Sequence, residues 1–133
     1  TKSANQKYLD KLMTEMKIHL DGKVKDIKVS QVLTDSPVCL IADEGEMDMH
    51  LERLMRQHKR LENESKKILE INGNHGLVKS MAKIVKDTHD KSLIKDISLL
   101  LLDQARIVEG ELPLDTKSFS ERLSSIMTKG LGV

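Results

Sequence analysis

The residues that could carry out chemistry in this sequence do not occur at the spacings that catalysis or metal binding requires. The chain contains five histidines: His19, His50, His58, His75 and His89. No two of them stand four residues apart, as the ligands of a helical zinc site do. Asp35 and His75 are an acid and a base, but the sequence supplies no nucleophile for them to activate. We therefore expect no enzyme active site in this chain.

The single cysteine and two short motifs are better explained by structure than by ligand binding. Cys39 lies in the apolar run 38–42, where burial would raise its pKa and leave the thiol inert. The acidic stretch 43–48 lacks the alternating ligands and distant Glu of a helix–loop–helix calcium site, so we expect Asp43 to cap a helix with Glu46. The glycines of the stretch 73–76 match no phosphate-binding loop and indicate a turn.

Composition excludes several classes of protein. The chain has 133 residues and 15.0 kDa, which suits one domain. A net charge of +1 and 2% aromatic residues argue against a nucleic-acid partner. The longest apolar run, 97–102, ends at Asp103 and is too short to span a membrane. One cysteine permits no internal disulfide, which is consistent with a reducing, cytoplasmic location.

Hydrophobic periodicity predicts helices and three short strands. Apolar residues at helical spacing predict a first helix from Leu9 to Leu20, which Asp21 and Gly22 end. Alternation at 26–30, the apolar run 38–42 and the segment 67–72, which Gly73 and Asn74 end, predict three strands, and the run 38–42 is expected to be buried on both faces. Further helices are predicted at about 44–60, 77–85 and 93–108, and a last one capped by Asp115 or Thr116.

The predicted helix at 44–60 carries an apolar stripe with methionines: Met47, Leu51, Leu54 and Met55. Flexible, polarisable methionines adapt to varied partners, so such a stripe can bind peptides. A stripe of this kind more often belongs to an ordinary core. The sequence leaves both interpretations open.

The last two predicted helices have more apolar surface than two helices can cover. The helix at 93–108 is apolar around much of its circumference, and the connection to the final helix is short enough for an antiparallel hairpin. A second copy would complete a four-helix bundle with a two-fold interface. The alternative is that the strands or earlier helices cover this surface within one chain. The position of the hairpin after all the strands favours the dimer.

Four segments together resemble one protein family. They are Leu33-Thr34-Asp35-Ser36-Pro37-Val38, Ile68-Leu69-Glu70-Ile71-Asn72 with His75 and Leu77-Val78-Lys79, Leu100-Leu101-Leu102-Asp103-Gln104-Ala105, and Phe119-Ser120-Glu121-Arg122-Leu123. In this order and spacing they look like the C-terminal domain of the heat-shock protein 90 chaperones, in the bacterial form called HtpG. The ending 130–133 lacks the acidic tail of cytosolic eukaryotic relatives, which fits the bacterial form.

The resemblance implies an α+β fold in which a small three-stranded mixed sheet packs with helices. It implies one C-terminal dimerisation domain over 1–133, with an α/β core at 24–90 and a dimerisation hairpin at 91–129 that forms an intermolecular four-helix bundle. The residues expected at the dimer interface are Ile94, Ile97, Leu101, Leu102, Ala105, Val108, Phe119, Leu123, Ile126 and Met127. The residues expected to contact client proteins are Met47, Leu51, Leu54 and Met55.

The resemblance also implies what the rest of the parent protein would supply. ATP and Mg²⁺ would bind a separate N-terminal domain, so this chain alone would need no cofactor and would not hydrolyse ATP. Its partners would be a second copy, non-native client proteins and the parent's own middle and N-terminal domains, in the cytoplasm. The alternative is a monomeric adaptor that binds one partner helix through the stripe from Met47 to Met55.

Overall fold

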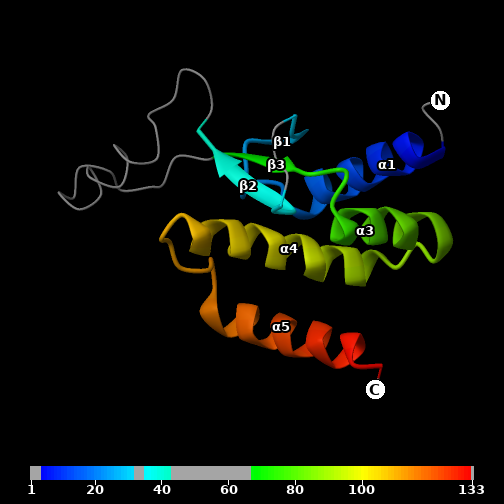
Figure 1. Cartoon of the computed structure of the whole chain (residues 1–133). Helices are drawn as coiled ribbons and strands as arrows, with labels where there is room; N and C mark the ends of the chain where they lie inside the picture. Colours follow the sequence, from blue (N-terminus) through cyan, green and yellow to red (C-terminus); the bar gives the residue numbers. More distant parts are fainter. Residues whose placement is uncertain (1–3, 32–34, 43–66, 133) are drawn as a thin grey trace.

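The computed structural model describes residues 4–31, 35–42 and 67–132 (Figure 1). The elements in these ranges are α1 (Ala4–His19), β1 (Asp26–Val29), β2 (Val38–Ile41), β3 (Ile68–Ile71), α3 (Gly76–Asp87), α4 (Lys91–Val108) and α5 (Thr116–Gly130). Each lies where hydrophobic periodicity predicted a helix or a strand. The predicted helix at about 44–60, with Met47, Leu51, Leu54 and Met55, lies outside the described residues and stays a prediction.

The three strands form one mixed sheet in the order β1-β3-β2. β3 is central, and it pairs in parallel with β1 and antiparallel with β2, so that Leu69 stands opposite both Ile27 and Leu40. Leu69 and Ile71 are completely buried. The α+β fold with a small three-stranded mixed sheet is therefore confirmed.

One expectation about the sheet is wrong in detail. The run 38–42 was expected to be buried on both faces, but in β2 only Val38 and Leu40 are buried, and Cys39 and Ile41 are partly exposed. The reason is position: β2 is an edge strand, so its alternate side chains receive less cover than those of the central strand β3. The free Cys39 thiol is thus only half-buried.

The helix α4 lies in the middle of the molecule. It packs against α1, α3 and β2, while α5 lies along its other side (Figure 1). The α4 side chains that join the core are Ile94, Leu99, Leu101, Leu102 and Ala105. They meet Leu12 and Met16 of α1 and Met81 of α3 in a single hydrophobic cluster. Each fully buried large apolar side chain contributes about 1.5–3 kcal/mol, so α4 is the main source of stability among the helices.

Local signals at the helix ends agree with the sequence. α1 ends just before Asp21 and Gly22, and Gly22 has φ +79°, a conformation that favours glycine. Asp115 is the N-cap of α5, as predicted, because its carboxylate accepts hydrogen bonds from the backbone N–H groups of Lys117 and Ser118. His75 caps α3 in the same way, since its Nδ1 accepts the Leu77 N–H at 3.0 Å.

Tyr8, the only tyrosine, joins α1 to α3 at the surface. Two ammonium groups lie over its ring: Nζ of Lys11 is 5.4 Å from the ring centroid, and Nζ of Lys86 is 5.5 Å from it. These distances are within the range of cation–π attraction. None of the helices in the described part of the chain is long and apolar enough to cross a membrane.

Ser98 destabilises α4 in its present surroundings. Its side chain is completely buried, and its hydroxyl has no hydrogen-bond partner among the described residues. Since a buried hydroxyl without a partner is costly and alanine is the better helix former, we expect Ser98→Ala to raise the free energy of unfolding by about 1 kcal/mol. Urea denaturation measures this. Ser80→Ala, at an exposed position of α3, is the control and should change stability by less than about 0.5 kcal/mol; an equal gain there would contradict the explanation.

Candidate interaction face on the C-terminal helix pair

The C-terminal helices form the predicted hairpin. α5 runs antiparallel to α4 and packs along it (Figure 1). In contrast to α4, α5 contains no buried residue. Phe119 and Ile126 are half-buried on it, while Leu123 and Met127 are exposed. The hairpin therefore consists of one core helix and one outer helix with a largely uncovered surface.

The ten residues predicted for the dimer interface fall into three groups. Ile94, Leu101, Leu102 and Ala105 are buried in the core of this one chain. Ile97, Phe119 and Ile126 are half-buried. Val108, Leu123 and Met127 are exposed. Their assignment to a dimer interface stays a prediction, and the third group is the one whose side chains are free for a partner.

Exposed apolar side chains concentrate on the hairpin. Of the nine large hydrophobic residues that are exposed in the described part of the chain, seven belong to residues 107–131. We call these seven the hairpin surface: Ile107, Val108, Leu112, Leu114, Leu123, Met127 and Leu131. Val108 is 78% exposed and Met127 57%. Such concentrations on soluble proteins mark interaction sites. Leu112, Leu114 and Leu131 were not predicted from the sequence, because the first two lie in the connection and the third after the predicted stripe, where helical periodicity gives no signal.

The connection between α4 and α5 is held by two α4 side chains. The carboxylate of Asp103 accepts the backbone N–H of Leu114 at 3.0 Å. Nε of Arg106 donates to the carbonyl oxygen of Leu112 at 2.8 Å. α4 ends at Val108 with Glu109 as its C-cap, and Gly110, the next residue, has φ +87°, the left-handed conformation that commonly follows the end of a helix.

The pKa values of two carboxyl groups at the hairpin, those of Asp103 and Asp115, are shifted in opposite directions. Asp103 is only 2% exposed, and burial raises the pKa of its carboxyl group against the opposing effects of the Leu114 N–H, Arg122 and Arg106. The Ser118 backbone N–H lowers the pKa of the exposed Asp115. Arg122 of α5 also pairs with Asp96 of α4 at 3.8 Å, but both side chains are partly exposed, so this pair contributes little.

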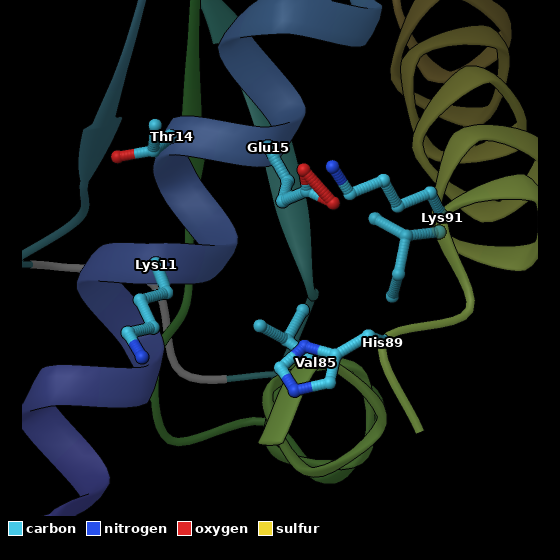
Figure 2. A pocket seen from close by; sticks show the side chains of 7 residues that line it. Lys11, Thr14, Glu15, Val85, His89 and Lys91 are labelled. Atoms are coloured by element: carbon cyan, nitrogen blue, oxygen red, sulfur yellow. The ribbon is translucent and has the colours of Figure 1, made fainter. Parts of the chain in front are cut away.

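A cavity of about 330 Å³ lies between α1, the α3–α4 junction and the start of α4 (Figure 2). It is lined by Lys11, Thr14, Glu15, Val85, His89, Lys91 and Ile94. His89 adopts φ +53°, which lets the chain turn from α3 into α4. In Figure 2 the side chains of Lys91 and Glu15 extend toward each other, so cationic and anionic groups line the same wall. The Thr14 hydroxyl donates to the carbonyl oxygen of Asp10 at 3.1 Å, and the lining combines charges of both signs with apolar side chains.

The other candidate residues have structural roles. Within the described ranges no group of three His, Cys, Asp or Glu side chains could hold a metal ion. His75 uses its Nδ1 to cap α3. The prediction that burial raises the pKa of the Cys39 thiol is confirmed, and the nearby Glu70 and Glu109 carboxylates raise it further. A raised thiol pKa means less thiolate, and therefore less reactivity, at neutral pH.

Comparison with known proteins identifies the family. The family model described as Hsp90 protein matches residues 1–133, so the chain belongs to the Hsp90 family. Among curated relatives, it is 46% identical to Chaperone protein HtpG of Paramagnetospirillum magneticum, over 98% of this chain and 21% of that protein. It is 44% identical to Chaperone protein HtpG of Roseobacter denitrificans (92% of this chain, 20% of that protein) and 40% identical to that of Wolbachia pipientis wMel (96% and 20%). The chain thus spans about one fifth of the length of these relatives.

A charge introduced into α4 should destabilise the chain strongly at a buried position and weakly at an exposed one. We expect Leu101→Asp to unfold the chain, because it removes a core side chain and buries a charge at a position that is 2% exposed, at a cost of about 4 kcal/mol or more. Val108→Asp, at a position of the same helix that is exposed in one chain, should leave the chain folded and, at a protein concentration low enough for the chain to be monomeric, should cost less than about 1 kcal/mol. Far-UV circular dichroism and heat unfolding measure both. A fully folded Leu101→Asp chain would show that α4 is not held as described.

Proposed function

We propose that this chain is the C-terminal homodimerisation and client-contact domain of an HtpG-type Hsp90 chaperone. Membership of the Hsp90 family gives the chaperone class. The observation that carries the specific role is the hairpin surface, which holds seven of the nine exposed large hydrophobic residues in the described ranges. A second copy of this chain is the proposed occupant of that surface.

The geometry of the hairpin suits a two-fold assembly. α4 is covered by the core on one side and by α5 on another, so an isolated chain provides a two-helix layer with apolar residues left outside. Two such layers related by a two-fold axis form a four-helix bundle, in which the same surface on each copy meets itself. Burying Val108 and Met127 in this way would remove from water two side chains that are mostly exposed in one chain.

Dimerisation would give the domain its mechanical role in a longer chaperone. Joining two copies at the hairpin keeps the upstream parts of both chains at a high effective concentration, so that their closure becomes intramolecular. ATP binding and hydrolysis would belong to those upstream parts. The segment with Met47, Leu51, Leu54 and Met55 would contact non-native clients through its apolar side chains, since methionine adapts to partners of varied shape.

Sedimentation equilibrium tests the dimer. We expect the chain to have about twice its monomer mass of 15.0 kDa at low micromolar concentration. Val108→Asp and Met127→Asp should each raise the dissociation constant at least about 100-fold, because each would bury an unpaired charge twice in a two-fold interface. Ile18→Asp is the matched control, since Ile18 is an exposed apolar residue of α1, on the other side of α4 from α5 (Figure 1). A wild-type chain that stays monomeric would refute dimerisation and favour the monomeric adaptor.

Client contact is tested separately, with the dimer kept intact. We expect the double substitution Leu51→Ser and Leu54→Ser to weaken binding of a permanently unfolded protein, such as reduced and carboxymethylated α-lactalbumin, by about tenfold or more, because two apolar contacts are lost. Fluorescence anisotropy of the labelled probe measures this affinity. Ile18→Ser serves as the control for a lost exposed apolar side chain. Unchanged affinity in the double variant would place client binding elsewhere.

A further inference from the structure

The orientation of α5 depends on very few interactions. α5 has no buried residue, so no side chain of this helix is locked in the core. Its ion pair to α4, Arg122 with Asp96 at 3.8 Å, is partly exposed to solvent and holds it weakly. Other contributions come from the partial burial of Phe119 and Ile126 and from the path of the connection that leads into the helix.

That connection is fixed at two points, one on each side of Pro113. Before the proline, the carbonyl oxygen of Leu112 accepts a hydrogen bond from Nε of Arg106 at 2.8 Å. After it, the N–H of Leu114 donates to the carboxylate of Asp103 at 3.0 Å. Arg106 and Asp103 are three residues apart and therefore lie on the same side of α4, one turn from each other. Asp115, which directly follows Leu114, is the N-cap of α5, so the second fixed point lies immediately before the helix.

We propose that Asp103 and Arg106 form a latch that fixes the α4–α5 connection and thereby orients α5 for contact with a second copy of this chain. This inference rests on the dimerisation proposed above. The two latch residues are positioning residues: Asp103 is buried in one chain and acts through Leu114, while the exposed apolar residues of α5 make the contact.

Burial makes Asp103 the stronger half of the latch. A carboxylate acceptor in a site that excludes water forms a stronger hydrogen bond than a neutral or exposed acceptor does. Asp103 is 2% exposed and its hydrogen bond to Leu114 is partly buried, whereas the hydrogen bond from Arg106 to Leu112 is exposed to solvent. The side chain of Asp96, which pairs with α5 outside the latch, is 35% exposed. Asparagine at position 103 can accept the same N–H through its amide oxygen, and alanine cannot.

The size of the expected change in the dissociation constant follows from the fraction of molecules in which α5 is correctly oriented. If loss of the latch leaves α5 correctly oriented in about one tenth of the molecules, each protomer binds with an affinity reduced by that fraction. A two-fold dimer needs both protomers in the competent state, so its dissociation constant would rise about 100-fold. Stability of the core should change much less, because α5 contributes no buried residue to it.

The experiment compares Asp103→Ala with Asp103→Asn and with Asp96→Ala. We expect Asp103→Ala to speed amide hydrogen exchange in α5 about tenfold and to raise the dissociation constant about 100-fold, while α1 and α3 keep their protection. Asp103→Asn should stay within about threefold of the wild-type chain in both measurements, because it keeps the acceptor. Asp96→Ala, which removes the same charge from the same helix, should also stay within about threefold.

Two results would overturn the latch. One is an Asp103→Ala chain with wild-type exchange in α5 and a wild-type dissociation constant; the other is an Asp103→Asn chain as impaired as Asp103→Ala. If Asp103→Ala loses protection throughout the fold, Arg106→Met decides: faster exchange confined to α5 supports the latch, and unchanged exchange refutes it. Hydrogen exchange in α5 reports on the latch even in a monomeric chain, so its failure is distinguishable from failure of the proposed dimer.

Discussion

The burial of α4 is the constraint on which the rest of the structure depends. Ile94, Leu101 and Leu102 of this helix enter the same hydrophobic cluster as side chains from α1, α3 and the sheet. Because these elements come from distant parts of the chain, α4 helps to hold them in one domain, together with the direct packing of α1 against α3 and β1. The same helix carries α5 on its other side, so every property of the hairpin is built on a rigid core element.

Periodicity and capping residues predicted the elements well, because their signals are local. The alternation around Ile27, the turn at Gly22 and the cap at Asp115 need only a few neighbouring residues to act. Burial could not be predicted as well, because it depends on which elements become neighbours. Cys39 stands in an apolar run but on an edge strand, and Leu101 and Val108 belong to one apolar helix but differ completely in exposure.

The connection between α4 and α5 is a second feature that local sequence signals could not predict. Asp103 and Leu114 are eleven residues apart, and their hydrogen bond spans the end of a helix and a turn, where neither helical nor strand periodicity applies. In the sequence, Asp103 was only the polar residue that interrupts an apolar run. Its burial, and the raised pKa that accompanies it, arise from packing that brings the connection back over α4.

The place of Tyr8 gives the molecule a built-in optical reporter. With one tyrosine and no tryptophan, emission excited at wavelengths that phenylalanine does not absorb comes from a single ring. The ammonium groups of Lys11 and Lys86, from two different helices, lie over this ring. That ring lies at the junction of α1 and α3, away from α5. Tyrosine emission therefore reports on the packing of α1 against α3, and we expect dissociation of a partner from the hairpin to change it little.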